Sequence, residues 1–559
     1  MPTIEAVFKD LQRLVGKKLP MDEEELNETL SYIKGEVESF EEDVVKIEIK
    51  DGNRPDLWTV EGVARELKGA LGVETGLKDY TIKNSSNVEV YVDAKLESVR
   101  PYIAAAIVKG VNLDDESLRG LIQLQEKLDQ TYGRRRKRTS IGLYNFDLIK
   151  PPLCYKAVKP SEVSFVPLEF TEELDLAEIL KKHPKGVEYG HIVKDQNSWP
   201  ILVDSADQVL SFPPIINSND LGRVTEDVEN ILVEVTGTSH QTLLNTLTIV
   251  TLSLADRGGD IYSTMINYPY QDLGFEVTPI FEERKMRIPV EDFNKIIGVQ
   301  IPGDRIIESL RKARYGASLA KSEVQVAIPC YRVDVMHPVD IIEDASIMYG
   351  YNNIEPRWPQ LPTIGQTSEK QMLTDLVREI MIGFGYQEIL TFSMTNKQRL
   401  FENMNLEETR VVEVSNPKTL TYTCLRSWLT PSLVEFLSSN THIEYPQRIF
   451  EVGDVVVLDE TAEERVREER KLACLSAHAD SNFNEAKSVL DAFFLNLGKT
   501  YELKEIRHDS FIAGRVGGIL VDNIDAGVIG ELAPGVLENW KIGNPTAAFE
   551  IALDKLFPV

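Results

Sequence analysis

The sequence lacks the cysteine pairs and the long apolar runs that would assign it to several common classes of protein. Its 4 cysteines lie far apart and form no Cys-x-x-Cys motif, so we expect reduced thiols and no zinc site. No apolar run approaches the ~20 residues that a membrane-spanning helix needs, and the first residues form no signal-peptide core. These absences predict a soluble, cytoplasmic chain with no membrane partner.

Motifs of familiar enzymes are also missing. The sequence contains no GxxxxGK[ST], no GxGxxG after a strand, no HExxH and no GxSxG. The 7 histidines are scattered, and His240, which follows Thr238 and Ser239, is read more simply as a structural residue. The net charge of −28 argues against broad non-specific binding of nucleic acid, although it leaves room for a local basic site.

The chain is long enough to form several hydrophobic cores. A chain of 559 residues with 42% hydrophobic and 27% charged residues predicts a multidomain globular protein. We expect an α+β fold with domains at residues 1–84, 85–271, 272–355 and 366–559. The proline-rich segment PRWPQLPTIGQTS is the predicted linker before the last domain.

Hydrophobic periodicity predicts the main elements. The spacing of Ile4, Val7, Phe8, Leu11 and Leu14 predicts an amphipathic helix at the start of the chain. Helices are also expected at residues 22–33, 57–71, 115–131, 369–382 and 484–498. Strands are expected at VVKIEIK, VEVYVDA, YIAAAIVKGV, VENILVEVTG, GFGYQEILTFSMT, VVEVSNP, RIFEVGDVVVLD, VGGILVD, AGVIGEL and AAFEIALD.

One dense basic run stands out in this acidic chain. It consists of Gly133 followed by Arg134, Arg135, Arg136, Lys137 and Arg138. Five consecutive cations favour a local anion site, and a phosphate backbone is the expected anion. A solvated loop is the alternative.

A polar loop follows further along the chain. The residues Ser211, Asn217, Ser218, Asn219 and Asp220 flank a Pro213–Pro214 step, which imposes an extended and rigid approach. Such a loop can present amide and hydroxyl groups to a ligand, or it can be only a turn.

The third feature is an acidic cluster of Asp334, Asp340, Glu343 and Asp344. Pro338 is expected at the first position of a helix, which places the last three carboxylates on one helical face. Like charges at that spacing repel each other. Either the helix dipole or a bound hard cation could compensate, and the residues alone leave both alternatives open.

Four groups of segments, in this order, resemble the beta subunit of phenylalanyl-tRNA synthetase in its archaeal and eukaryotic form. They are NRPDLWTVEGVAREL; GRRRKRTSIGLYNFD with SFPPIINSNDLGRVT; PCYRVDVMHPVDIIEDASIMYGYNNI; and LRSWLTPSLVEFLSSN with RIFEVGDVV. The resemblance implies an editing domain at 85–271, a small metal-site domain at 272–355 and a class II synthetase-like antiparallel sheet module at 366–559. It also implies a partner alpha subunit in an (αβ)₂ tetramer, and tRNA-Phe as a ligand.

That module departs from active class II synthetases. Its last strand region, TAAFEIALDKL, has neither the arginine nor the glycine run that would hold ATP. We therefore expect a non-catalytic module, with ATP used by the alpha subunit of the complete enzyme.

The resemblance implies that this chain hydrolyses mischarged Tyr-tRNA, because a hydrophobic pocket cannot strongly reject an isostere that adds a hydroxyl. Asn217 and Ser211 are the expected catalytic residues. The expected substrate-binding residues are Leu202, Asn219, Asp220 and the cations Arg134, Arg135, Arg136, Lys137 and Arg138. The expected Mg²⁺ ligands are Asp334, Asp340, Glu343 and Asp344. Two alternatives stay open: a tRNA-binding assembly subunit without editing, and a metal-dependent phosphotransferase.

Overall fold

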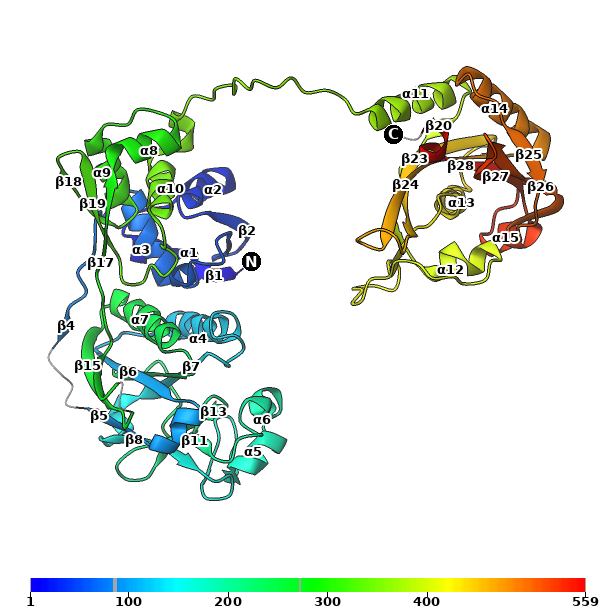
Figure 1. Ribbon diagram of the computed structural model, residues 1–559. Coiled ribbons are helices and arrows are strands. Elements are labelled where there is room, and N and C mark those ends of the chain that lie inside the picture. Colours follow the sequence, from blue (N-terminus) through cyan, green and yellow to red (C-terminus); the bar gives the residue numbers. More distant parts are fainter. Residues whose placement is uncertain (1, 84–87, 271–272, 558–559) are drawn as a thin grey trace. The chain divides into compact units, whose positions relative to one another are not determined.

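The computed structural model describes residues 2–83, 88–270 and 273–557. The chain divides into two compact units, Met1–Trp358 and Pro359–Val559 (Figure 1). The boundary falls within the proline-rich segment that follows Ile354. Within the described ranges, no helix is long and apolar enough to cross a membrane.

The first unit begins with a three-stranded sheet in the order β1-β3-β2. Its strands are β1 (Thr3–Val7), β2 (Gly35–Glu41) and β3 (Val44–Ile49), and its core is shared with α1 (Phe8–Val15), α2 (Glu23–Ser31) and α3 (Val60–Ala70). The predicted first helix is wrong over its initial residues. Residues 3–7 instead form a strand, in which Ile4 pairs with Ile47, and the helix begins only at Phe8. A short run in which apolar and polar residues alternate can bury its apolar side chains in a strand as well as in a helix.

An 11-stranded sheet follows, with the order β13-β12-β11-β8-β5-β15-β6-β14-β7 and with β4 and β16 both paired to β15. The strands are β4 (Ile82–Lys83), β5 (Glu89–Val92), β6 (Tyr102–Lys109), β7 (Thr139–Asn145), β8 (Leu153–Val158), β11 (Trp199–Val203), β12 (Val209–Phe212), β13 (Ile216–Asn217), β14 (Ile231–Gly237), β15 (Asp260–Asn267) and β16 (Phe275–Thr278). A smaller lobe holds β9 (Ser164–Phe165), β10 (Leu174–Asp175), α5 (Leu176–Lys182) and α6 (Pro184–Tyr189).

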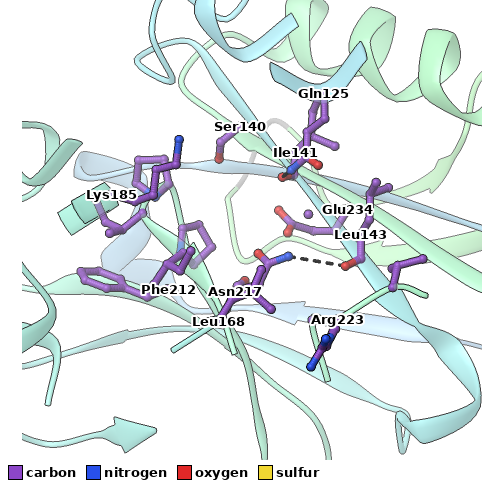
Figure 2. A pocket seen from close by; sticks show the side chains of 18 of the residues that line it. Gln125, Ser140, Ile141, Leu143, Leu168, Lys185, Phe212, Asn217, Arg223 and Glu234 are labelled. Carbon is purple, nitrogen blue, oxygen red and sulfur yellow. Dashed lines mark hydrogen bonds between the residues drawn. The ribbon is translucent and has the colours of Figure 1, made fainter. Parts of the chain in front are cut away.

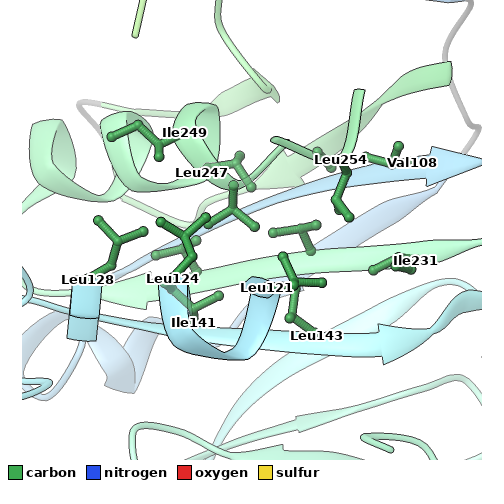
Figure 3. Close-up of a cluster of buried hydrophobic side chains, with 14 of the residues drawn as sticks. Val108, Leu121, Leu124, Leu128, Ile141, Leu143, Ile231, Leu247, Ile249 and Leu254 are labelled. Atoms are coloured by element: carbon green, nitrogen blue, oxygen red, sulfur yellow. The ribbon is translucent and has the colours of Figure 1, made fainter. Parts of the chain in front are cut away.

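Two helices, α4 (Asp115–Gln130) and α7 (His240–Asp256), cover one face of the strands β6, β14 and β7. Figure 3 shows Leu124 and Leu128 of α4 meeting Leu247 of α7 above Ile141 of β7. The i, i+4 spacing of the α4 leucines places them on one face of that helix. This core fixes β7 and β14, from which part of the candidate site is built.

The first unit ends in a smaller α/β region. It contains β17 (Arg284–Pro289), α8 (Val290–Ile297), α9 (Gly303–Lys312), β18 (Gly316–Ala320), β19 (Glu323–Ile328) and α10 (Pro338–Tyr349), with the sheet order β17-β19-β18. Pro338 is at the start of α10, as predicted. Asp334 lies in the loop between β19 and α10.

The second unit is built on a seven-stranded sheet in the order β20-β23-β24-β28-β27-β26-β25. The strands are β20 (Gln387–Glu388), β23 (Gln447–Leu458), β24 (Val466–Ala477), β25 (Glu502–Glu505), β26 (Phe511–Val521), β27 (Ile524–Leu532) and β28 (Thr546–Ala552). Successive residues of β24 face opposite cores: Leu472 packs with α11 (Glu369–Gly383) and α14 (Phe483–Asn496), whereas Ala473 packs with α13 (Thr430–Ser439) and α15 (Pro534–Asn539).

Short elements complete this unit: β21 (Met394–Thr395), α12 (Lys397–Leu400), β22 (Cys424–Leu425) and α16 (Leu553–Leu556). The strand predicted at VVEVSNP is wrong, since only Glu413 forms an isolated bridge, to Cys424. The strand predicted at GFGYQEILTFSMT is reduced to β20 and β21. Both stretches have β-branched residues, but they find no long partner strand in the described structure. The sequence predicts a multidomain α+β fold, and the coarser part of that prediction, several domains of mixed helices and strands, is confirmed.

Candidate functional site

The principal candidate site is a pocket of about 420 Å³ between the two ends of the large sheet. In strand order β7 and β12 are far apart, yet side chains join them. The Tyr144 hydroxyl on β7 lies 2.8 Å from Ser211 Oγ on β12, and Asn217 Nδ2 on β13 donates to the Leu143 carbonyl at 3.4 Å. Figure 2 shows Asn217, Leu143 and Glu234 around the same space. The pocket therefore combines residues that are far apart in the chain.

A buried polar chain forms one wall of the pocket. Tyr144 Oη is 2.8 Å from Ser211 Oγ and 2.8 Å from Glu234 Oε2, and all three residues are buried. The phenol has only one proton to donate. When Glu234 is ionised, the phenol donates to the carboxylate and Ser211 donates to the phenol. Ser211 is thus held as part of a polar network and has no base that would make it a nucleophile.

Glu234 is the unusual group in this wall. Its side chain projects from β14, an otherwise apolar strand, and its Oε1 has no hydrogen-bond partner within the described structure. Burial raises the pKa of the Glu234 carboxyl to about 7, while the hydrogen bond from Tyr144 acts in the opposite direction. A buried carboxylate oxygen without a partner is costly. A ligand that donates a hydrogen bond at this point would remove that cost.

His183 lines the pocket but is not a free base. Its Nε2 lies 3.1 Å from the Leu168 carbonyl oxygen, and its Nδ1 accepts the Lys185 N–H at 3.2 Å. Because a carbonyl oxygen can only accept, Nε2 carries the proton and the ring is the neutral Nε2–H tautomer. Both nitrogens are therefore used in holding the α6 region beside the pocket.

The fold places only some of the predicted loop residues at the pocket. Ser211, Asn217 and Asn219 line the pocket. Asp220 is exposed and does not line it, and Leu202 is fully buried in the core, opposite Ser211 in the β11–β12 pairing. The roles expected of Leu202 and Asp220 as direct ligand contacts are therefore not supported by their positions.

The residues of the basic run also differ in their positions. Arg134, Arg135 and Lys137 are exposed, and no ion pair joins them to another residue of the described structure. Arg138 is half-buried. Arg136 alone lines the pocket, and its side chain is only 13% exposed, with Nε 3.0 Å from Asp129 Oδ2.

Gly142 of β7 leaves the room that the polar chain requires. A Cβ at this position would collide with the Tyr144 hydroxyl and lie 2.5 Å from Glu234 Oε2. We expect Gly142→Ala to lower the free energy of unfolding by about 1–3 kcal/mol, because it overpacks a buried polar contact. Gly120→Ala is the matched control, since Gly120 lies in α4 with open space around it. That change should raise stability by about 0.5–1 kcal/mol. Equal effects of the two changes in urea unfolding would contradict the crowding argument.

The acidic cluster was predicted to hold Mg²⁺, and its geometry does not fit that ion. Arg332, 2% exposed at its side chain, donates to Asp334 Oδ1 and Oδ2 at 2.9 and 2.7 Å and to Asp344 Oδ2 at 2.7 Å. Asp340 accepts the N–H groups of Met336 and His337, both at 2.8 Å. An arginine and a helix N-terminus therefore occupy the oxygens that would coordinate the cation.

The remaining carboxylate of the cluster points elsewhere. Glu343 pairs with Lys34 at 2.9 Å, and its side chain is half exposed. Over residues 2–83, 88–270 and 273–557, no group of three or more His, Cys, Asp or Glu side chains is placed to hold a metal ion. The helix-dipole alternative is supported at Asp340, whose carboxylate caps α10.

Sequence reasoning missed Glu234, Tyr144 and the inward turn of Arg136. A signal for Glu234 was present: it is the one charged residue in the apolar strand ILVEVTG. A carboxylate at such a position must be buried, and a buried carboxylate needs a partner or a function. Nothing local in the sequence indicates the partner of Tyr144, because Ser211 is on β12, which is far from β7 in the strand order.

Comparisons with known proteins agree with this architecture. Residues 286–351 match the tRNA synthetase B5 domain, and residues 354–553 match the phenylalanyl tRNA synthetase beta chain CLM domain. These two matches place the chain in the class of tRNA synthetase beta chains.

Full-length relatives narrow the class further. The phenylalanine–tRNA ligase beta subunits of Pyrococcus horikoshii and Pyrococcus furiosus are each 45% identical to this chain, over 100% of both proteins. A crystal structure of an N-terminal fragment of the Pyrococcus horikoshii phenylalanyl-tRNA synthetase beta-subunit is 43% identical. It covers 63% of this chain and 100% of the fragment, with a TM-score of 0.60. The chain belongs to the family of phenylalanine–tRNA ligase beta subunits.

Proposed function

We propose that this chain works as the beta subunit of a phenylalanine–tRNA ligase, with an alpha subunit in an (αβ)₂ assembly and tRNA-Phe as the nucleic-acid ligand. The full-length match to proteins of that name supports the proposal. The alpha subunit carries out the ATP-dependent attachment of phenylalanine. It also binds any Mg²⁺ that the nucleotide requires.

The C-terminal unit serves as a non-catalytic, class II-like module. Helix α13 is buried on the sheet face formed by β23, β24 and β28. The Glu550 carboxylate on β28 accepts the N–H groups of Leu429 and Thr430 at 3.0 and 2.9 Å and the Thr430 hydroxyl at 2.7 Å. Lys471 pairs with the same carboxylate at 3.2 Å. The chain's own helix thus fills this face, and no arginine of TAAFEIALDKL is available to hold phosphates.

The pocket of the large sheet removes tyrosine from mischarged tRNA. The observation that carries this proposal is the buried Glu234 Oε1, which has no hydrogen-bond partner among the described residues. The hydroxyl of an esterified tyrosine would donate to this oxygen, whereas phenylalanine would leave it unpaired. A site that is built to bind a hydroxyl can reject the analogue that lacks it by a large factor. A pocket of about 420 Å³ is also within the range of small-molecule sites.

Hydrolysis at this site uses water as the nucleophile. Among the described residues that line the pocket, no serine or cysteine is activated by a histidine, since His183 has both nitrogens bound to backbone. Water adds to the ester carbonyl carbon, the bond to the ribose oxygen breaks, and that oxygen receives the proton. The products are tyrosine and uncharged tRNA. Asn217 orients the ester or the water, and the neighbouring ribose hydroxyl assists proton transfer.

Asn217→Ala tests this assignment. We expect hydrolysis of Tyr-tRNA to fall about 100-fold, because a preorganised donor beside the reacting carbonyl is lost. Phenylalanine charging should remain intact, so that Tyr-tRNA accumulates during charging with tyrosine. The measurement is release of labelled tyrosine from Tyr-tRNA by the complete enzyme.

The control for this experiment is Asn496→Ala, which removes an exposed amide on α14 that donates to the Ala492 carbonyl at 2.8 Å. Unchanged hydrolysis of Tyr-tRNA by Asn217→Ala would refute the role of Asn217. Absence of hydrolysis by the unaltered enzyme would refute the editing function itself.

A further inference from the structure

The segment that joins the two compact units contains a repeat that a simple linker does not need. From Pro356 the chain reads PRW, PQL and PTI, three triplets that each begin with proline and end with a large apolar residue. The apolar residues are Trp358, Leu361 and Ile364. Flexible linkers are typically rich in glycine and serine, and a plain spacer gains nothing from large apolar side chains. The repeat therefore indicates a more specific use.

These apolar side chains have no partner within the described part of the chain. Trp358, Leu361 and Ile364 are 95%, 69% and 96% exposed. Residues 355–367 form no helix or strand (Figure 1), and no hydrogen bond or ion pair joins them to the rest of the described structure. No charged residue lies between Arg357 and Glu369, although the chain has a net charge of −28. An exposed, uncharged apolar stretch of this kind indicates an interaction site.

The prolines favour the polyproline II conformation over the repeat. Each proline fixes its own φ at about −65°, and it also disfavours the helical region for the residue before it. Trp358 and Leu361 each precede a proline, so both are biased towards extended or polyproline II geometry. A polyproline II helix has about 3 residues per turn and rises about 3.1 Å per residue. Side chains three residues apart thus lie on one edge, about 9 Å from each other.

The repeat gives the segment three different edges. One edge holds the prolines and a second holds the apolar residues, whereas Arg357, Gln360 and Thr363 belong to the third. A bend at residues 362–363 interrupts the line, so that Trp358 and Leu361 form its straight part. Proline-rich segments of this kind dock in apolar, aromatic-lined grooves of other proteins. The entropic cost of docking is low because the conformation is already formed.

The partner that covers this edge should be a protein that stays bound. A partner that binds only briefly would leave the large apolar side chains in water for much of the time, which favours aggregation. RNA is a less suitable partner, because it is held chiefly by cations against its phosphates and Arg357 is the one cation of residues 355–369. The alpha subunit of the proposed assembly is a protein partner that stays bound.

A second copy of this chain is also a less suitable partner. Its cavity of about 300 Å³ has aromatic walls that could receive a tryptophan, but four charged residues also line it: Lys78, Asp79, Glu282 and Glu283. Covering charged groups with an uncharged apolar edge removes them from water without giving them a partner, which is costly. The observations therefore favour the alpha subunit.

We propose that Trp358 and Leu361 dock in an apolar groove of the alpha subunit, with residues 356–362 in the polyproline II conformation. This docking rests on the proposed function, which supplies the alpha subunit. The groove should have two apolar pockets about 9 Å apart, one for each side chain. Tryptophan is enriched among the few residues that dominate the binding energy of an interface, so Trp358 is the principal anchor.

The fluorescence of Trp358 reports directly on the docking. The chain has 5 tryptophans, all within the described ranges: Trp58, Trp199 and Trp540 are buried, Trp428 is half-buried and Trp358 alone is exposed. The difference in emission between the unaltered complex with the alpha subunit and the W358F complex is therefore the signal of residue 358. We expect this signal at shorter wavelength than that of tryptophan in water, and resistant to quenching by iodide. A signal that iodide quenches as fully as free tryptophan would overturn the proposal.

Substitutions on two edges of the segment separate docking from the mere presence of a linker. W358S/L361S should weaken association with the alpha subunit about 30-fold, as the loss of a dominant interface residue does. The matched control is R357S/Q360S, which changes the same number of residues one position earlier and should weaken association less than about twofold. I364S should have a smaller effect than L361S, because Ile364 lies beyond the bend. Dissociation of the complex on dilution, followed by sedimentation, is the measurement.

Equal effects of the two double changes would contradict docking along one edge. Thermal unfolding of this chain should be the same in all variants, because the substituted side chains are exposed and make no contact that the fold needs. The complex without tRNA should already show the shielded Trp358 signal. Shielding that appears only when tRNA-Phe is added would overturn the proposal in favour of RNA.

A photoreactive phenylalanine analogue in place of Leu361 identifies what covers the edge. Irradiation of the complex should join this chain to the alpha subunit, as peptide mass spectrometry would show. A product with a second copy of this chain, or within one chain, would overturn the proposal. A complex that forms while Trp358 stays in water would overturn the docking alone and leave the proposed function standing. If the unaltered chain forms no complex with an alpha subunit, the proposed function is refuted, and the docking with it.

Discussion

Glu234→Gln is expected to reduce hydrolysis of Tyr-tRNA roughly 100-fold, since a hydrogen bond to a charged acceptor contributes about 1.5–3 kcal/mol. The change is nearly isosteric, so Tyr144 and Ser211 keep their places around the side chain. It also removes a buried charge, which leaves the fold as stable as before or more so. The loss would therefore report on recognition of the tyrosine hydroxyl and not on folding. Steady-state deacylation of Tyr-tRNA by the complete enzyme is the measurement.

The pH dependence of the same reaction provides a second check. Burial raises the pKa of Glu234 to about 7, so the carboxylate is the minor form below that pH and the major form above it. The ionised form is the stronger acceptor for a tyrosine hydroxyl. Hydrolysis should therefore rise between pH 6 and 8 in the unaltered enzyme and be flatter in Glu234→Gln. An identical rate and pH profile in the two proteins would exclude Glu234 as the acceptor.

The local features of this site could be predicted from the sequence, and its long-range contacts could not. The Pro213–Pro214 step and its flanking amides indicated a rigid polar loop, and Ser211, Asn217 and Asn219 do line the pocket. Glu234 was missed because a carboxylate inside an apolar strand has a meaning only when the neighbouring strands are known. β7 and β12 are far apart in the strand order, yet the Tyr144 hydroxyl lies 2.8 Å from Ser211 Oγ, and no local pattern in the sequence indicates this contact.

The acidic cluster is a second case in which the sequence predicts the positions of side chains but not their partners. Asp340, Glu343 and Asp344 share one helical face by spacing, as a local pattern predicts. Their partners are not set by the helix spacing. Glu343 pairs with Lys34, which precedes β2 and is far away in the sequence, whereas Asp344 pairs with Arg332, 12 residues earlier. Local spacing therefore placed the charges correctly but could not tell an arginine from a cation as the group that neutralises them.

Arg332→Met is expected to lower the free energy of unfolding of the N-terminal unit by about 3–5 kcal/mol, the cost of leaving buried charges without a partner. Asp334 and Asp344 are 8% and 12% exposed at their side chains and would lose their principal cation. Arg54 forms only a long ion pair with Asp334, with Nε 3.8 Å from Oδ1, and its shorter bonds are to Asp56 and Glu66. It therefore cannot take over both carboxylates from Arg332. Denaturant unfolding measures the change in the free energy of unfolding, and thermal unfolding by calorimetry is the second measurement.

A matched control and the pH profile sharpen this prediction. Arg305→Met breaks an exposed pair with Glu308 and should cost at most about 1 kcal/mol. Arg332 holds the pKa of Asp334 down to about 2, although burial acts in the opposite direction. The stability that this pair supplies is therefore present above pH 4 and lost as the pH falls towards 2. The difference between the unaltered chain and Arg332→Met should shrink over that same interval.

Chelation distinguishes the arginine from a metal ion. If Arg332 neutralises the cluster, EDTA and millimolar Mg²⁺ should both leave the unfolding temperature of the N-terminal unit unchanged. A chain that contains Mg²⁺ after purification, and that unfolds several degrees lower in EDTA, would restore the cation site predicted from the sequence. A triple change of Arg332, Asp334 and Asp344 to apolar residues should be less harmful than Arg332→Met alone, because no charge is then left buried. The single change is damaging chiefly through the two carboxylates that it leaves behind.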